Sequence, residues 1–235
     1  MSGGKCPLCD SDRVSFYKGA GSGYPLVKCK ECSLVFDPKI PDYTKEVYSE
    51  KYYLGIGLKG GYYNYFEEAV VNKLTFKHRL RGIISKVGSK KVNLLDVGCG
   101  LGDFLEVARS FPVTHCVGTE ISEFALVNCR KKGLRVYSIL EELSMRFDVV
   151  TVQDVVEHFR SPVRELKKVW ELLKPNGLLF LTTPDISSLS AKVFGQHWYH
   201  YKKLEHLFYF NLATIRILVE KSGFEDIEIK PTLSW

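Results

Sequence analysis

Two pairs of cysteines near the start of the chain have the spacing of metal ligands. Four of the seven cysteines fall in the first 32 residues, as Cys6 with Cys9 and Cys29 with Cys32. Four thiolates can surround Zn²⁺ tetrahedrally and leave no open position, so the predicted zinc site is structural. Disulfides and a redox-active pair are the alternatives. The expected cytoplasmic location disfavours disulfides, and the lack of a thioredoxin-like pattern disfavours redox chemistry.

A second group of residues could hold a positively charged nucleoside. Residues 93–103 read Asn-Leu-Leu-Asp-Val-Gly-Cys-Gly-Leu-Gly-Asp, which predicts a strand followed by a glycine-rich loop. The loop lacks the Gly-Lys-Ser/Thr of a phosphate-binding loop. Asp96 would repel a pyrophosphate but suits an ammonium or sulfonium group. Glu120, which ends the next predicted strand, suits the two ribose hydroxyls. S-adenosylmethionine (SAM) is a nucleoside with these features and without phosphate.

Four segments match the motifs of one known family. Residues 93–102 resemble its VLDxGCGxG motif, and residues 147–158 resemble its fourth strand with the turn beyond. Residues 172–179 resemble its LKPGG turn, and an acidic residue follows the second strand. Residues 91–235 are thus similar to class I SAM-dependent methyltransferases. This resemblance implies a set of cofactor-binding residues: Asp96, Gly98, Cys99, Gly100, Gly102, Glu120, Ile121 and Gln153. The alternatives are an NAD-type Rossmann domain and an inactive methyltransferase-like fold.

Alternating strands and helices must position these residues. The predicted strands are Val92–Val97, Thr114–Thr119, Arg135–Ser138, Phe147–Gln153, Leu178–Thr183 and Phe224–Lys230. The predicted helices cover residues 102–110, 122–132, 162–173 and 211–222. Repeated βα units of this length predict an α/β fold with a doubly wound, mostly parallel sheet, of the Rossmann-like methyltransferase type.

We expect three segments along the chain. Residues 1–40 form a zinc ribbon that is too small to be stable without its metal. Residues 41–90 form a tyrosine-rich linker or lid that ends in a helix at 66–87. Residues 91–235 form the SAM-binding methyltransferase domain. Apolar positions spaced by three and four residues predict the buried face of the helix: Val70, Val71, Leu74, Leu80, Ile83, Ile84 and Val87.

The candidate residues for the methyl acceptor lie after the fourth predicted strand and after the fifth. Asp154, Glu157 and His158 have a spacing that places them on one face of a helical turn, and His206 lies on a later loop. This pattern resembles two groups of metal-dependent O-methyltransferases, which act on small-RNA 2′-hydroxyls and on ubiquinone precursors. The resemblance implies a second divalent metal, which would lower the pKa of an acceptor hydroxyl. The alternatives are that His158 and His206 act directly as catalytic residues, or that they only pack.

Composition narrows the classes of protein further. Of the 235 residues, 45% are hydrophobic and 26% are charged, which is typical of a folded globular chain. The net charge of +6 is too small to imply nucleic-acid binding, and residues 1–45 contain seven basic and five acidic residues. No apolar segment is long enough to span a membrane, and the first ten residues lack the apolar core of a signal peptide, so we expect a cytoplasmic protein.

These observations together predict an enzyme with a small-molecule substrate. The combined zinc ribbon and methyltransferase domain resemble methyltransferases that act on sugars, polysaccharide intermediates or related metabolites. Two alternatives stay open. One is a metal-dependent RNA 2′-O-methyltransferase, which would need a basic groove. The other is a non-catalytic interaction protein with a methyltransferase-like fold.

Overall fold

The computed structural model describes residues 5–17, 25–39, 47–55, 65–88, 91–202 and 205–231. They divide into two compact units that interleave along the sequence. We call the first the cysteine unit: Met1–Pro41, Val156–Trp170 and Thr183–Trp235. We call the second the sheet unit: Asp42–Val155 and Glu171–Thr182. The division into three segments at residues 40 and 90 stays a prediction, and Tyr43, Tyr62 and Tyr63 of the predicted lid lie outside the described residues.

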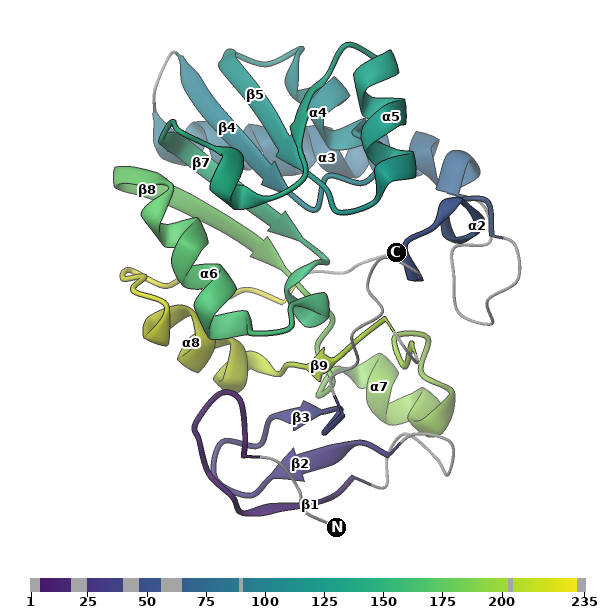
Figure 1. Cartoon of the computed structure of the whole chain (residues 1–235). Helices are drawn as coiled ribbons and strands as arrows, with labels where there is room; N and C mark the ends of the chain where they lie inside the picture. Colours follow the sequence, from purple (N-terminus) through teal and green to yellow (C-terminus); the bar gives the residue numbers. More distant parts are fainter. Residues whose placement is uncertain are drawn as a thin grey trace. The chain divides into compact units, whose positions relative to one another are not determined.

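The sheet unit is built on five parallel strands (Figure 1). In chain order they are β4 (Val92–Val97), β5 (Val113–Thr119), β6 (Arg135–Tyr137), β7 (Phe147–Gln153) and β8 (Leu173–Thr182). Their order across the sheet is β6-β5-β4-β7-β8, with each neighbouring pair parallel. This confirms the predicted doubly wound sheet. The direction of winding changes at β4, between β5 and β7, where sheets of this kind bind ligands at the carboxyl ends of their strands.

The sheet unit also contains helices, most of which share an apolar core with the sheet. They are α2 (Glu50–Tyr53), α3 (Tyr65–Val87), α4 (Asp103–Ala108) and α5 (Glu123–Lys131), with a short 3₁₀ turn η2 (Leu140–Glu142). Leu80 and Ile83 of α3 join the core that includes Leu94 of β4 and Leu105 of α4. The prediction that Leu74 belongs to the buried face was wrong. Leu74 is 71% exposed, and Phe76 packs on the core instead.

The cysteine unit contains a separate antiparallel sheet in the order β1-β2-β3-β9. Its strands are β1 (Val14–Phe16), β2 (Val27–Cys29), β3 (Val35–Phe36) and β9 (Phe208–Tyr209). Val35 pairs with Tyr209, so a strand from late in the chain completes the sheet of the predicted ribbon. Leu26, Val35, Ala191, Trp198 and Tyr209 form its core. The N-terminal segment therefore folds as part of a larger unit.

The helices of the cysteine unit are α6 (Pro162–Glu171), α7 (Leu189–Phe194) and α8 (Leu212–Lys221), with 3₁₀ turns η3 (Val156–His158) and η4 (Gly195–His197). The predicted strand at Phe224–Lys230 was wrong. A strand needs a neighbour with which to exchange hydrogen bonds. Among the described residues this segment has no strand partner, and Asp226 interrupts it with a left-handed φ of 51°.

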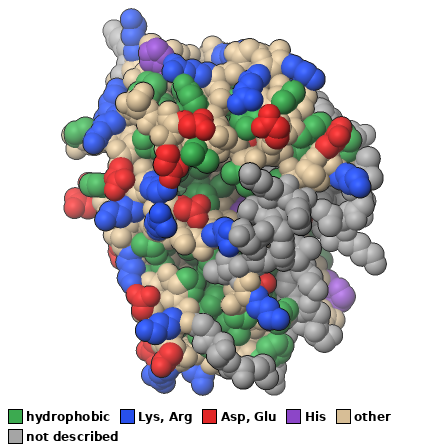
Figure 2. All heavy atoms as spheres, viewed as in Figure 1, with side chains coloured by type: hydrophobic (Ala, Val, Ile, Leu, Met, Phe, Trp, Pro, Cys, Tyr) green, Lys and Arg blue, Asp and Glu red, His purple; other side chains and the backbone are tan. Residues whose placement is uncertain are grey.

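The visible surface carries charges of both signs. Figure 2 shows one face, on which Lys and Arg side chains are interspersed with Asp and Glu side chains. A protein that follows a phosphate backbone collects basic side chains into a stripe. The coloured side chains of this face show no such stripe. Among the described residues, every helix falls short of the length and apolarity that crossing a membrane requires.

Candidate functional site

The loop between β4 and α4 has a backbone that glycine adopts easily. Gly98, Gly100 and Gly102 have left-handed φ angles of 69°, 52° and 82°. A Cβ on Gly98 would lie 2.5 Å from Cγ2 of Val155, and one on Gly102 would lie 2.3 Å from Cδ1 of Leu134. Side chains are therefore excluded by conformation and by space at both positions. We call residues 98–102 the glycine loop.

Cys99 belongs to the glycine loop and is buried. The N–H groups of Gly98 and Cys99 both donate to Thr119 O, which ties the loop to the end of β5. The Cys99 thiol lies 4.0 Å from Gly100 O. The hydrogen bond of this thiol with Cys129, and then burial, raise the pKa of Cys99 far above its usual range. The Cys99 thiol therefore strongly favours its neutral form.

Asp96 stands at the end of β4 with its side chain buried. Its Oδ1 accepts hydrogen bonds from Thr151 Oγ1 at 2.5 Å and from Gln153 Nε2 at 3.5 Å. Burial raises the pKa of Asp96 to about 7, although the bonds from Thr151 and Gln153 act in the opposite direction. A buried carboxylate needs a compensating positive charge. A bound cation would supply that charge and favour the ionised form.

Glu120 follows β5 and is also buried. Its Oε1 accepts a hydrogen bond from Ser122 N at 2.8 Å, and its Oε2 accepts one from Gly100 N at 3.0 Å. Burial raises the pKa of Glu120, and these backbone donors offset part of that rise. The carboxylate is thereby fixed beside the glycine loop. Ile121, the next residue, leaves its side chain 47% exposed, as an apolar surface beside this carboxylate.

The structure adds two polar residues that sequence reasoning missed. Thr151 donates to Asp96 from the adjacent strand β7. Arg79 of α3 donates from Nη1 to Gln153 Oε1 at 2.9 Å. Arg79, Gln153 and Asp96 thus form one polar chain at the ends of β4 and β7. Arg79 lies within the helix predicted at 66–87, which does not identify its partner, and the order of the strands was needed to place Thr151 beside Asp96.

The four N-terminal cysteines come together in the cysteine unit. The sulfur atoms of Cys6, Cys9, Cys29 and Cys32 all lie within 4.8 Å of one another. The Cys6–Cys32 and Cys9–Cys29 pairs are 3.6 and 3.5 Å apart. Tetrahedral zinc with Zn–S bonds of ~2.3 Å separates its sulfur ligands by roughly 3.8 Å. The sulfur positions therefore fit a zinc ion.

Both Cys-x-x-Cys turns have the same backbone. The residue after the second cysteine is left-handed in each turn, at Asp10 with φ 60° and at Ser33 with φ 69°. Asp10 N donates to Cys6 O, and Ser33 N donates to Cys29 O. Burial raises the pKa of Cys6 to about 11, whereas at Cys29 the N–H groups of Cys32 and Glu31 outweigh burial and lower the pKa to about 7. Such backbone donors favour the thiolate that a metal binds.

A second cluster in the cysteine unit contains the histidines predicted for the acceptor side. The ligand atoms of Glu157, His158 and His206 lie within 4.8 Å of one another. Glu157 is buried, and its Oε2 accepts a hydrogen bond from Thr183 Oγ1 at 2.9 Å. The rings of His158 and His206 meet edge to face at 4.7 Å. Asp154, the fourth residue of the predicted set, belongs to the sheet unit and has a left-handed φ of 54°.

The surroundings of the two histidines decide which nitrogen or protonation state each can offer. His158 Nδ1 lies 2.8 Å from Glu205 O, so a neutral ring donates there and presents Nε2 as its basic nitrogen. Burial, followed by the charges of His158, Lys202 and His200, lowers the pKa of His206 well below its usual range. Neutral imidazoles beside a carboxylate form a donor set that several divalent metals accept.

Comparison with known proteins identifies the larger part of the chain. Residues 67–229, more than two thirds of the sequence, match a family described as a methyltransferase domain. This range includes the glycine loop, Asp96, Glu120 and the cluster of Glu157, His158 and His206.

Relatives of known function match less of the chain. The ubiquinone biosynthesis O-methyltransferase of Coxiella burnetii is 31% identical over 115 residues, which are 45% of this chain and 49% of that protein. The tRNA U34 carboxymethyltransferase of Campylobacter jejuni is 26% identical over 65% of this chain and 55% of that protein. The chain thus spans about half the length of the curated relatives it matches. The crystal structure of a SAM-dependent methyltransferase from Archaeoglobus fulgidus, 26% identical, matches 70% of this chain and 75% of that one, with a TM-score of 0.56.

Proposed function

The chain belongs to the family of methyltransferase domains of the SAM-dependent class, and on that premise we propose that it methylates a hydroxyl group of a small molecule. The observation that carries the proposal is the combination of the left-handed glycine loop with buried Asp96 and Glu120. SAM supplies a methyl group already activated by its sulfonium. The protein therefore has to bind and orient the reactants and remove a proton.

Each residue of the cofactor site has a role that its chemistry suits. Glu120, fixed by Ser122 N and Gly100 N, would accept hydrogen bonds from the ribose hydroxyls. Asp96 would face the positive charges of the methionine part, which compensate its buried carboxylate. Ile121 would cover the adenine with its exposed apolar side chain.

On the acceptor side we propose that Glu157, His158 and His206 hold a divalent metal ion. Such an ion would bind the acceptor oxygen and lower the pKa of its hydroxyl. The lowered pKa of His206 keeps its imidazole neutral, as a ligand must be. A cluster without metal would support the other role, in which His158 or His206 takes the acceptor proton directly.

The functions of two relatives bear on the class of acceptor. The Coxiella burnetii relative is named for O-methylation in ubiquinone biosynthesis, which supports a small hydroxyl compound. A sugar or polysaccharide intermediate is the acceptor predicted from sequence. The Campylobacter jejuni relative is named for tRNA, so a panel of acceptors must also contain RNA. Methylation of RNA alone would replace the small-molecule proposal.

We also propose that Cys6, Cys9, Cys29 and Cys32 bind a structural zinc ion. The support is the mutual distance of the four sulfur atoms and the matching backbone of the two turns. Reduced thiols of this kind persist in the cytoplasm, which is the location we propose.

The test begins with calorimetric titration of the purified, zinc-loaded chain with SAM and S-adenosylhomocysteine (SAH). We expect micromolar binding of both. Titration with Mn²⁺ then tests the acceptor side, with His206→Ala as the variant and His115→Ala, an exposed histidine of β5, as the control. Mn²⁺ binding that is lost only in His206→Ala supports the metal. Failure of the folded chain to bind SAM or SAH would overturn the proposal that it is an enzyme and would favour the alternative of an interaction protein.

A further inference from the structure

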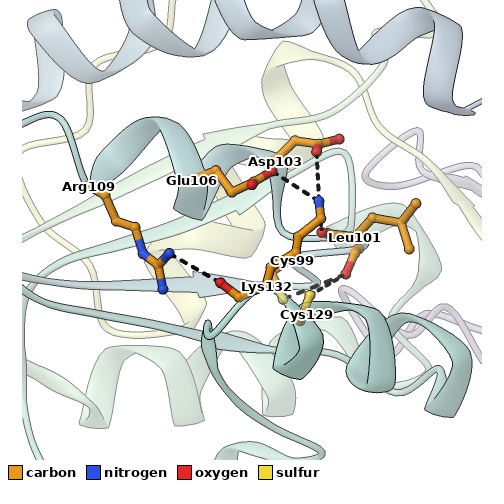
Figure 3. A network of polar contacts seen from close by, with 8 residues as sticks. Cys99, Leu101, Asp103, Glu106, Arg109, Cys129 and Lys132 are labelled. Atoms are coloured by element: carbon orange, nitrogen blue, oxygen red, sulfur yellow. Dashed lines mark hydrogen bonds and ion pairs between the residues drawn. The ribbon is translucent and has the colours of Figure 1, made fainter.

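The last turn of α5 reaches the glycine loop with two side chains. Lys132, the residue that ends α5, donates from Nζ to Leu101 O at 2.9 Å. Cys129, one turn earlier, donates from its thiol to Gly100 O at 3.3 Å. Two consecutive carbonyls of the glycine loop are therefore held by residues of one helical face (Figure 3).

Lys132 also neutralises the start of α4. Its Nζ lies 3.3 Å from Asp103 Oδ1 and 3.0 Å from Glu106 Oε2 (Figure 3). Asp103 is buried, so its carboxylate depends on a nearby cation. Burial would lower the pKa of Lys132, but its bond to Glu106 and the charge of Asp103 outweigh that and raise it. The ammonium stays charged.

Among the described residues, no side chain caps the start of α4. The helix begins at Asp103, and the preceding residue, Gly102, has no side chain with which to cap it. At the other end of α4, Arg109 donates to Lys132 O and Gly133 O, which end α5. Lys132 therefore contacts both ends of α4. Its ammonium lies at the start of α4, near the glycine loop, and its carbonyl accepts a hydrogen bond from Arg109 at the end.

We propose that Lys132 is a positioning residue for SAM, which holds the glycine loop in its binding conformation; this rests on the proposed function. Three left-handed glycines cost conformational entropy to order. Without the ammonium, Leu101 O loses its donor, and Asp103 and Glu106 repel each other. The loop then adopts its binding conformation less often, and the apparent affinity for SAM falls in proportion to that fraction.

The experiment compares Lys132→Met, which keeps the apolar stem, with Lys131→Met on the same helix. Lys131 is exposed and serves as the matched control. We expect the dissociation constants of SAM and SAH to rise about tenfold in Lys132→Met and to stay within about twofold in Lys131→Met. Lys132→Arg should restore most of the affinity, because a guanidinium also carries charge and donors. A residue that only stabilises the fold would lower the melting temperature without changing binding by the folded protein.

A second variant covers the case in which Lys132→Met fails to fold. Asp103→Asn combined with Glu106→Gln removes the anchors of the ammonium and leaves Lys132 in place. We expect SAM affinity to fall at least about threefold in this double variant. SAM affinity within about twofold of the wild type, in either folded variant, would overturn the role of Lys132 and leave the proposed function intact. If the wild-type chain itself binds neither SAM nor SAH, the proposed function fails and takes this inference with it.

Discussion

The glycine loop and the cluster of Glu157, His158 and His206 are assembled in different ways. The glycine loop is one continuous segment, which the adjacent strand β5 supports through Thr119 O and Glu120. The cluster joins a 3₁₀ turn to a segment about fifty residues later, through contacts such as that between His158 and Glu205 O. A site made from one segment can be recognised from a local sequence motif. A site made from distant segments depends on how they pack.

Of the changes considered, loss of the zinc site should have the largest effect, and that effect should fall on stability rather than on SAM affinity. We expect Cys29→Ser to remove the zinc and to cost the cysteine unit about 5 kcal/mol of stability or more, because metal binding contributes folding free energy. SAM affinity should change by less than about threefold, since the glycine loop lies in the sheet unit.

Metal analysis, thermal unfolding and SAM titration measure these three quantities. Cys116→Ser, a thiol of β5 outside the cluster, is the matched control and should keep its zinc. One zinc per chain in Cys29→Ser would show that this cysteine is not a ligand.

Gly98→Ala tests whether the glycine loop depends on local backbone. In this variant the left-handed φ of 69° and the 2.5 Å approach to Val155 should strain the loop by about 2 kcal/mol. If the loop moves to relieve that strain, SAM affinity should fall roughly 30-fold, which is the same free energy. Gly82→Ala on α3 has open space around its Cβ and should be stabilising by about 0.5–1 kcal/mol. Calorimetric titration and denaturant unfolding measure both. Equal SAM affinity in the two variants would remove the strain argument.

Asp96 should make SAM binding depend on pH. Because the pKa of the free carboxyl is about 7, SAM affinity should rise between pH 6 and 8, as the ionised form becomes dominant. Asp96→Asn should weaken binding about tenfold at pH 8 and flatten this profile. In the ligand-free wild type, stability should fall as pH rises from 3.8 to about 7, because the unfolded chain releases this proton first.

SAM titrations across this pH range test the predicted rise in affinity, and denaturant unfolding tests the predicted fall in stability. A profile for Asp96→Asn that parallels the wild type would show that another group carries the pH dependence.

Arg79 should give the smallest effect. Its guanidinium donates to Gln153 and lowers the pKa of Asp96 from a distance. Arg79→Met should therefore weaken SAM binding about threefold and move the rise in affinity to higher pH. Arg81→Met, an exposed position on α3, is the control. The same pH profile in both variants would show that Arg79 does not influence the titration of Asp96.

Much of the sheet unit could be predicted from sequence. Five predicted strands are present, and its helices α3, α4 and α5 lie within a few residues of their predicted bounds; α6 and α8 of the cysteine unit do so as well. Hydrophobic runs between turn residues mark such elements locally. Asp96, Gly98 and Glu120 could be chosen for the same reason, since each stands where a predicted strand ends.

Other features could not be read locally. The sequence of Phe224–Lys230 alternates like a strand, but a ladder also needs a partner, and the described chain offers none. Strand β9 has two residues, too few for a pattern, and exists because Val35 and Phe36 pair with it. No sequence pattern marked Lys132, because its partners Asp103 and Glu106 lie on another helix.

By itself the sequence determined that the chain has a parallel α/β sheet, a glycine loop suited to a charged nucleoside and four cysteines spaced for zinc. Those properties depend on residues that are neighbours in the chain, whose backbone preferences and side-chain types act locally. Only the tertiary structure decided that Thr151 and Gln153 bond to Asp96, that β9 completes the N-terminal sheet, and that His158 meets His206. Such pairings depend on packing between distant segments, which is not encoded in any one of them.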